Sequence, residues 1–454
     1  MLFSCFLAGS DDMGNGRQTS CPNPGSRPGG EDDTESKTTN NVYTDNNHDE
    51  ELRGNPSPPI DGDYASWYLP LVYQEHNRTR IVEQPLDFTT LAEKYNHFAT
   101  KFTEDHQDEP FLLYVPFSHV HATSGRNEHF DPQPNHQQYA SCPFQGKSKR
   151  GAFGDALSEI DWMVGNVHDK LKELDLEENT LIVFTSDNGP WNAAEHNDGG
   201  SYGIFSGRSA GYPWTGKAST WEGGIREPAF AYFKGQIEPF SRSSETISSM
   251  DVFPTFSRLA GVPLPPHVTL DGRDMTDILL RENGKSKHDF LFIYGFCNGE
   301  WPRRGVTAVR HGPYKAHFCT APGLGGNKTD IKRYDDKFPL LFNVEEDPSE
   351  AFPICTGEGL PKNNPKASAA IMRIMRAYAM EKATFEYGNA TNVPDGPGEG
   401  PHRYGLCCDR ASNCSCTTSQ WDDVFQNSIF RIGSREHHSK YHEVLGETNH
   451  MEGK

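Results

Sequence analysis

The chain has 454 residues, of which 63 are acidic and 43 are Lys or Arg, giving a formal net charge of -20. Such a charge argues against a surface that binds nucleic acid or anionic membranes. No apolar run approaches the ~18 residues that a membrane span needs, and the length suits one large α/β domain with a smaller one.

The first segment, "MLFSCFLAG", is apolar but too short for a secretory signal, and it lacks a basic start. Residues 22–65 are rich in Pro, Gly, Asn and acidic groups. Because such a composition cannot bury enough apolar area to offset its ordering entropy, we expect a flexible acidic loop.

Order is expected to resume at "WYLPLVY", and a helix should follow. Apolar residues recur there at three- and four-residue steps and form one stripe of an amphipathic helix. Its members are Phe88, Leu91, Tyr95, Phe98 and Phe102. The next run, "PFLLYVPF" at 110–117, is continuously apolar, as in a buried parallel strand. It leads to His119 and His121.

A second helix is predicted before the strand "TLIVFTSDN". Its apolar face comprises Leu157, Ile160, Met163, Val164, Val167 and Leu171. Strand, helix and strand make a βαβ unit. The second strand ends on Asp187 and Asn188, which are ordinary turn formers. They also form an oxygen pair suited to Ca²⁺ or Mg²⁺ at the edge where α/β sheets place their chemistry. Both interpretations stay open from these residues alone.

The glycine-punctuated segment "WTGKASTWEGGIREPAFAYF" contains Lys217 and leads to another strand, and "SSMDVFPTFSRLAGVPLP" predicts a short strand and a helix closed by Gly261. Beyond residue 288 the predicted secondary structure changes. "GVTAVRHGPYKAHFCT" and "FPLLFNVEEDP" predict β-strands joined by turns, followed by a helix around "ASAAIMRIMRAYAMEKAT". We expect a catalytic domain at 66–287, an antiparallel-sheet domain at 288–417 and a tail at 418–454.

The cysteines indicate an exported protein. Four of them, Cys407, Cys408, Cys414 and Cys416, are dense enough for a disulfide knot, with a metal site less favoured. Because the adjacent Cys407 and Cys408 do not readily bridge each other, each of these two should pair with Cys414 or Cys416. In the smaller domain, Cys319 and Cys355 are candidate partners for a further disulfide, and Asn77, Asn327 and Asn389 are candidate glycosylation sites.

Several blocks in order resemble the sulfatase family, in particular its arylsulfatase A-like branch. They include "PFLLYVPFSHVHAT", "TLIVFTSDNGP", "TGKASTWEGGIREPAF", "AVRHGPYKAHF" and "LLFNVEEDP". The resemblance covers about residues 66–417. It implies an alkaline phosphatase-like fold, a doubly wound and mostly parallel sheet with a smaller C-terminal α+β domain. It also implies hydrolysis of a sulfate ester by a formylglycine and a bound Ca²⁺, which is favoured over Mg²⁺.

By this resemblance, Asp187 and Asn188 match the metal ligands, His121 matches a histidine that contacts the sulfate and the leaving-group oxygen, and Lys217 matches a sulfate-binding lysine. Breaking the S–O bond builds negative charge on the leaving oxygen. A cation and a proton donor placed there stabilise the transition state. Taken alone, a histidine after a strand or a lysine in a glycine loop is more often structural, and His119 is expected to be so.

One departure concerns the nucleophile. The family makes formylglycine from the cysteine of a C-x-P-x-R signature, and Cys21 in "SCPNPGSR" has the wrong spacing. We therefore expect the family's first third, including sheet strands, to be absent, and this chain as given to be inactive. The alternative is a catalytically inactive remnant or binding protein; a phosphoesterase of the same superfamily is less favoured.

The segment "LAGSDDMGNG" resembles two parts of the family. One is the N-terminal strand that ends in metal-binding aspartates. The other is a later "PYSxDMG" segment, which we favour because Cys21 and the acidic loop follow in the right order. On that interpretation residues 1–21 are a partial sulfatase segment and Ser10 contacts sulfate. The resemblance also implies a lysosomal or secreted protein acting on a small sulfate ester or a sulfated glycan or lipid.

Overall fold

The chain forms two compact units. Among the described residues, the first contains a four-stranded and a five-stranded sheet with their helices, and the second contains a three-stranded sheet. The computed structural model describes residues 2–7, 70–75, 78–84, 86–121, 139–191, 200–211, 214–296, 304–323, 326–327, 330–334, 338–356, 359, 363–384 and 416–417. The predicted acidic loop at 22–65 and the tail at 418–454 lie outside these residues.

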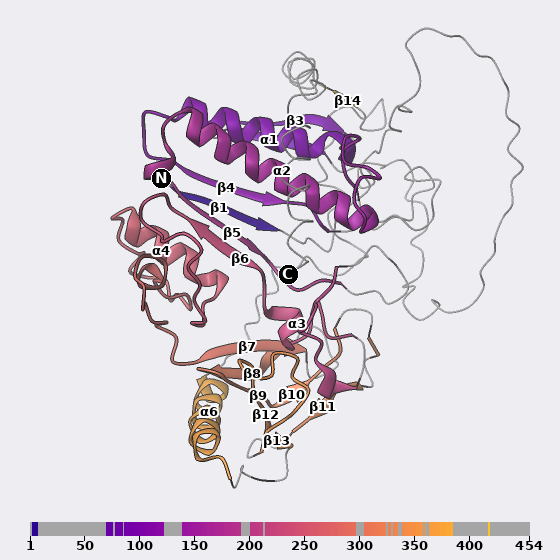
Figure 1. The fold of residues 1–454 in the computed structure, drawn as a ribbon, viewed down its shortest axis with the longest axis vertical. Helices are drawn as coiled ribbons and strands as arrows, with labels where there is room; N and C mark the ends of the chain where they lie inside the picture. Colours follow the sequence, from indigo (N-terminus) through magenta and orange to yellow (C-terminus); the bar gives the residue numbers. More distant parts are fainter. Residues whose placement is uncertain are drawn as a thin grey trace, which may run out of the picture. The chain divides into compact units, whose positions relative to one another are not determined.

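The four-stranded sheet has the order β4-β1-β5-β6 (Figure 1). β1 pairs in parallel with both β4 and β5, whereas β6 is antiparallel to β5. The carboxyl ends of three strands therefore meet at one edge of the sheet. The strands are β1 (Leu2–Leu7), β4 (Leu112–Phe117), β5 (Leu181–Ser186) and β6 (Ala229–Tyr232).

The position of β1 bears on the two interpretations of "LAGSDDMGNG". The apolar run Leu2–Leu7 lies between two parallel strands, where a continuously apolar strand is expected. This place suits the family's N-terminal strand that ends in metal-binding aspartates. The structure thus favours that interpretation over the later segment that the sequence favoured. Ser10, Asp11 and Asp12 follow in the sequence and lie outside the described residues.

Helices cover both faces of this sheet (Figure 1). α1 (Phe88–Asp105) and α2 (Gly151–Glu173) pack on one face, and α4 (Val252–Leu259) packs on the other. The side chains of β5 alternate accordingly: Ile182 belongs to the core with α1 and α2, while Leu181 and Val183 join the core with α4. A strand buried on both faces has to be apolar throughout, which explains its sequence.

Three details of the predicted packing are wrong. Phe98 and Leu157, assigned to buried helix faces, are 45% and 44% exposed, and the core takes Ala92 and Ala99 from α1 instead. β4 was expected to be buried on both faces, yet Leu112 is 59% exposed. The burial of β4 alternates because it is the edge strand of the described sheet and only one of its faces meets helices.

The segment before α4 was predicted as a strand and is a 3-10 helix, η4 (Ser249–Asp251). The Ser248 hydroxyl accepts from the backbone of Met250, and Asp251 accepts in return from the Ser248 amide. This reciprocal cap favours a helix start over an extended strand. The C-terminal end of the helix was predicted correctly, because Gly261 has a φ of 68° just beyond α4.

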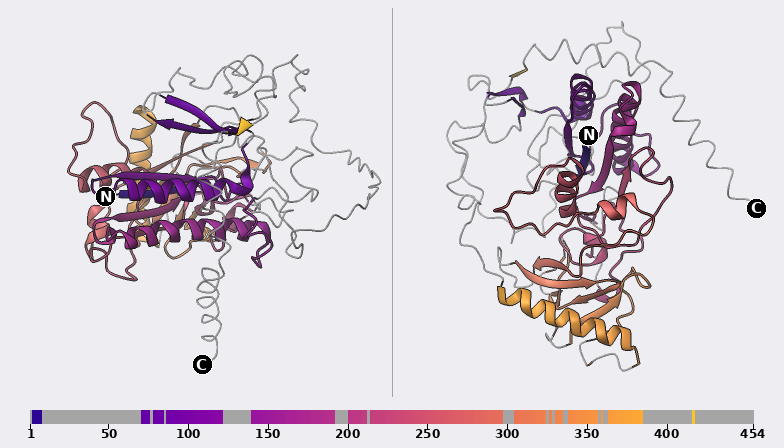
Figure 2. Two further views of the ribbon diagram at one scale, coloured as in Figure 1. Left: turned by 90° about the horizontal axis from the view of Figure 1, so that it is seen from above. Right: turned by 90° about the vertical axis from the view of Figure 1, so that its left-hand side faces the viewer.

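The five-stranded sheet has the order β13-β12-β9-β8-β7 and is antiparallel. α6 lies along one of its faces (Figure 2). The strands and helix predicted here are confirmed. Their bounds are β7 (Leu291–Phe296), β8 (Arg304–His311), β9 (Tyr314–His317), β12 (Leu340–Asn343), β13 (Cys355–Thr356) and α6 (Pro365–Thr384).

The two faces of this sheet meet different partners. Leu341 and Ala316 pack with Ile371 of α6. Phe342, on the opposite face of β12, packs instead with Trp221 from the glycine-rich segment. Alternation along the strands thus places the five-stranded sheet between α6 and the segment that carries Lys217.

The remaining elements are short. β2 and β3 form an antiparallel hairpin to which β14 adds a strand, and β10 pairs with β11. No helix in the described ranges is long and apolar enough to cross a bilayer. The bounds are β2 (Leu71–Glu75), β3 (Arg78–Gln84), β10 (Cys319–Thr320), β11 (Lys332–Arg333), β14 (Cys416–Thr417), η2 (Glu177–Asn179), η3 (Arg208–Ala210), α3 (Glu222–Ile225) and α5 (Thr276–Leu280).

The predicted pair of Cys319 with Cys355 is wrong. Cys319 is disulfide-bonded, as is Cys142, which was not among the candidates. Cys355 is a buried free thiol that donates to the Gly359 carbonyl at 2.9 Å. The two residues of the proposed pair lie on β10 and β13, which belong to different sheets. Of the predicted knot, Cys407, Cys408 and Cys414 lie outside the described residues, and the side chain of Cys416 in β14 is not described.

Candidate functional site

Polar residues follow two parallel strands of the four-stranded sheet at the same edge. Asp187 and Asn188 come directly after β5, and His121 comes four residues after β4. The Asn188 amide donates to Asp187 Oδ1 at 2.9 Å, so the aspartate also forms the turn expected of it. The His121 amide donates to the Ser118 carbonyl at 3.1 Å and closes the turn after β4.

The structure brings His121 and Lys217 together from positions 96 residues apart. The Lys217 Nζ lies 3.3 Å from the His121 Nε2, and both side chains are partly buried. The sequence had assigned both residues to one sulfate-binding site, although nothing in their spacing placed them side by side. The pair offers a cation and an imidazole to one small group.

Close backbone packing joins the Lys217 segment to the end of β5. The Lys217 amide donates to the Pro190 carbonyl at 2.9 Å, and the Gly189 amide donates to the Gly224 carbonyl at 3.0 Å. A Cβ added at Gly216 would lie 2.1 Å from the Pro190 oxygen, and one at Gly189 would lie 1.9 Å from the Gly223 oxygen in α3. Only glycine permits this approach, so the glycines bring Lys217 beside the strand that ends at Asp187.

A carboxyl group that the sequence analysis missed lies next to Asp187. Burial and the charge of Asp187 raise the pKa of Glu227 to about 8, against the lowering effect of a hydrogen bond with Ser186. Its Oε1 is buried and has no hydrogen-bond partner among the described residues. Glu227 stands in "GGIREPAF", which the sequence analysis used only as a block of family resemblance.

The oxygen donors at this edge are of the type that a hard cation binds, but they are fewer than such a cation needs. Asp187, Asn188 and Glu227 present oxygen atoms, and an orphaned carboxyl oxygen beside a second carboxylate is an environment that a cation stabilises. Ca²⁺ takes about 6–8 oxygen ligands. Within the described residues no group of three or more His, Cys, Asp or Glu is arranged to hold a metal.

His119 has a buried partner of its own. Its Nε2 lies 2.7 Å from Glu159 Oε2, and both side chains are fully buried. Glu159 also accepts from the Ser141 amide at 3.1 Å. This is the structural role expected for His119. Glu159 was missed because it lies on the apolar face of α2, where the sequence pattern favours core residues.

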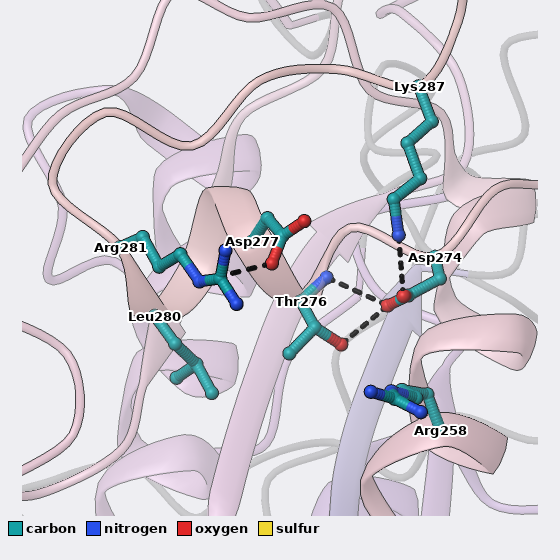
Figure 3. Close-up of a pocket in the computed structure, with 7 residues that line it drawn as sticks. All are labelled: Arg258, Asp274, Thr276, Asp277, Leu280, Arg281 and Lys287. Carbon is teal, nitrogen blue, oxygen red and sulfur yellow. Dashed lines mark hydrogen bonds and ion pairs between the residues drawn. The ribbon is translucent and has the colours of Figure 1, made fainter.

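A separate pocket lies beside α5 and contains none of the predicted site residues (Figure 3). Its charges are largely paired: Lys287 lies 2.7 Å from Asp274, and Arg281 lies 3.2 Å from Asp277. These surface ion pairs satisfy one another, so the pocket offers no reactive group. Ser10, the remaining predicted sulfate contact, lies outside the described residues.

Comparisons with known proteins point to one family. The Sulfatase family model matches residues 6–262, and the model of the C-terminal region of aryl-sulfatase matches residues 286–416. The chain is 34% identical to a steryl-sulfatase of Rattus norvegicus over 331 residues, which is 67% of this chain and 51% of the relative. It is 33% identical to arylsulfatase A of Homo sapiens over 344 residues, 73% of this chain and 61% of the relative.

A solved structure extends the comparison to the fold. The PsFucS1 sulfatase from Pseudoalteromonas sp. superposes with a TM-score of 0.53 at 28% identity, covering 69% of this chain and 58% of that one. The chain thus spans about half to three-fifths of the length of these relatives. Since the first family model alone covers more than half of the chain, this protein belongs to the sulfatase family.

Proposed function

We propose that this chain binds sulfate esters, the substrates that a complete sulfatase hydrolyses, and that the sulfate group binds at the edge where β4 and β5 end. The observation that carries this proposal is the contact of Lys217 Nζ with His121 Nε2, 3.3 Å apart, beside the strand that ends at Asp187 and Asn188. The lysine charge attracts the sulfate oxygens, and the imidazole is placed to hold or deliver a proton at the leaving-group oxygen.

In this proposal Asp187 and Asn188 would hold Ca²⁺, with Mg²⁺ less favoured. When bound, the cation would supply positive charge that attracts the sulfate oxygens and offsets charge in the transition state. Lys217, in the glycine-rich segment, orients the same sulfate group. The formylglycine nucleophile of the family has no matching cysteine signature in this chain, so the residues present account for binding, orientation and proton delivery.

We further propose a secretory-pathway location, either lysosomal or secreted. The disulfide-bonded Cys142 and Cys319 suit an oxidising compartment. Asn327, one of the candidate glycosylation sites, is exposed, while Asn77 and Asn389 lie outside the described residues. The substrate class remains a small sulfate ester or a sulfated glycan or lipid.

A binding and turnover experiment tests the proposal. The chain is titrated with a chromogenic aryl sulfate in the presence of Ca²⁺, and affinity and phenol release are both measured. Lys217→Ala and Asp187→Asn should each weaken binding by about tenfold or more, because each removes a charged contact. Lys149→Ala and Asp161→Asn change exposed residues of the same types and should leave binding unchanged.

The same experiment separates the two candidate functions. A sulfatase with a working nucleophile releases phenol, whereas an inactive, sulfate-binding member of the family binds without turnover. The missing cysteine signature favours binding without turnover for this chain. Equal affinities of wild type, Lys217→Ala and Asp187→Asn would contradict the site itself.

A further inference from the structure

A buried cluster of charged residues joins the glycine-rich segment to the five-stranded sheet and does not include the proposed sulfate-binding side chains. Lys315 Nζ lies 2.9 Å from Glu222 Oε1 and 3.1 Å from Glu350 Oε1, and His317 Nε2 lies 2.7 Å from Glu350 Oε1. The four side chains are at most 2% exposed. Such a cluster is costly to bury, so its presence at this place needs a reason.

The strand pattern explains how the cluster forms. Along β9, Ala316 faces α6, so Lys315 and His317 face the other way, toward the glycine-rich segment. Glu222 opens α3 at the end of that segment, five residues after Lys217. Glu350 comes from the turn after β12, and its Oε2 accepts from the Glu222 amide at 2.7 Å.

We propose that this cluster is a positioning device through which the five-stranded sheet sets the place of Lys217, with Glu350 as the central positioning residue. The inference rests on the proposed function, since it gives the C-terminal region a role in sulfate binding. Glu350 touches neither Lys217 nor the sulfate position. It acts through Glu222 and the segment between Lys217 and Glu222.

That segment is fixed at both ends. At one end the Lys217 amide is bound to Pro190, beside Asp187. At the other end Trp221 is fully buried and its ring contacts that of His317 in a tilted arrangement, with ring centroids 4.6 Å apart. Just before Lys217, the Gly323 amide, which follows β10, donates to the Trp214 carbonyl at 2.6 Å. Contacts from the C-terminal region thus lie on both sides of Lys217, and the Pro190 carbonyl holds its amide, so Lys217 has little freedom to move.

The charges of the cluster compensate one another only when the glycine-rich segment and the C-terminal region are in contact. Although burial alone would raise it, Lys315 and His317 hold the pKa of Glu350 well below its usual value. Burial lowers the pKa of His317, which favours the neutral ring. Arg226 and Arg310 approach Glu222 Oε2 at 3.4 and 3.7 Å and place further positive charge beside it. Because a mispaired buried charge is strongly unfavourable, the cluster selects one arrangement of the segment.

The backbone of Glu350 shows the same constraint. Its φ is +49°, in the left-handed region that is unfavourable for a non-glycine residue. The Glu350 carbonyl accepts from the Ser209 amide at 3.1 Å, and its own amide donates to the Asp347 carbonyl at 3.0 Å. Contacts from several directions therefore hold the carboxylate under the Glu222 amide.

The test follows Lys217 directly. Lysines of the folded chain are ¹³C-methylated, and the Lys217 signal is assigned with Lys217→Arg. In wild type the signal should differ from those of exposed lysines, because Lys217 Nζ lies 3.3 Å from the His121 ring. In Glu350→Gln it should move toward the signals of exposed lysines. The dissociation constant for inorganic sulfate should rise about tenfold or more.

Controls separate positioning from stability. Glu177 is a largely buried, ion-paired carboxylate just before β5, at the end of the strand opposite Asp187. Glu177→Gln should therefore destabilise the fold while leaving the Lys217 signal and the sulfate affinity unchanged. If Glu350→Gln does not fold, the double variant Lys315→Met with Glu350→Gln removes one charge of each sign and takes its place.

The outcomes are distinct. A folded Glu350 variant with an unchanged Lys217 signal overturns the positioning role, whatever the activity of the protein. Equal shifts of the Lys217 signal in the Glu177 and Glu350 variants also overturn it, because general loosening would then suffice. Absence of sulfate binding by wild type contradicts the proposed function, and the Lys217 signal still decides the positioning role.

Discussion

At the residue scale, Gly189 determines how closely the Lys217 segment approaches β5. A Cβ at this position would lie 1.9 Å from the Gly223 oxygen. We expect Gly189→Ala to displace the segment and to weaken sulfate binding by about tenfold or more. Gly146→Ala is the comparison, since its Cβ meets open space and only the positive φ is strained, at about 1 kcal/mol. Equal sulfate affinities of the two variants would show that the close approach does not matter.

Glu177 gives a prediction about pH. It accepts from the Tyr232 hydroxyl, Lys234 and His168, and the first of these contributes most to lowering the pKa of Glu177 from 4.5 to about 2. A depressed carboxyl pKa contributes stability above the unfolded-state value, and this stability is lost as the pH falls from 4.5 toward 2. Glu177→Gln should therefore lower the free energy of unfolding at pH 7 by about 1–3 kcal/mol and flatten its fall below pH 4.5.

The measurement for Glu177 is urea unfolding across this pH range. Glu178→Gln is the matched control, because the neighbouring carboxylate is 78% exposed and lies 3.5 Å from the same Lys234. It should change the stability by less than about 0.5 kcal/mol. An unchanged acid profile in Glu177→Gln would contradict the role assigned to Glu177.

At the element scale, β9 joins the glycine-rich segment to the five-stranded sheet through Lys315. Lys315→Met should destabilise the protein by about 3–5 kcal/mol, since it leaves Glu222 and Glu350 buried without their nearest cation. Lys315→Met combined with Glu222→Gln should recover part of this loss, which thermal unfolding of both variants would measure. Additive losses in the double variant would argue against a coupled cluster.

The sequence predicted most elements but not all of their contacts. Periodicity identified α1 and α2, yet Phe98 and Leu157 were misplaced because a helical stripe does not show how far its partner extends. The strand-end position made Asp187 and Asn188 possible metal ligands, whereas the roles of His121 and Lys217 came from family resemblance. The Glu222, Lys315 and Glu350 cluster had no signal, because its members lie on different elements 93 and 128 residues apart and charge patterns reveal only near neighbours.

At the scale of the whole molecule, bound Ca²⁺ should couple the site to overall stability. A ligand that binds only the folded state adds about 2.7 kcal/mol at a concentration 100 times its dissociation constant. We expect Ca²⁺ to raise the thermal unfolding temperature of wild type and not that of Asp187→Asn. Asp161→Asn, an exposed aspartate on α2, should respond like wild type. An equal rise in Asp187→Asn would place the stabilising cation elsewhere.

The central claim is that one site at the carboxyl ends of β4 and β5 binds an oxyanion between Lys217 and His121. A crystal structure of the chain grown with Ca²⁺ and vanadate tests it most directly, because vanadate has the tetrahedral shape of sulfate and strong scattering. We predict vanadate in contact with Lys217 Nζ and His121 Nε2, and a cation on Asp187 and Asn188. Vanadate bound only elsewhere, with the Lys217 and His121 side chains in contact and no anion between them, would contradict the account.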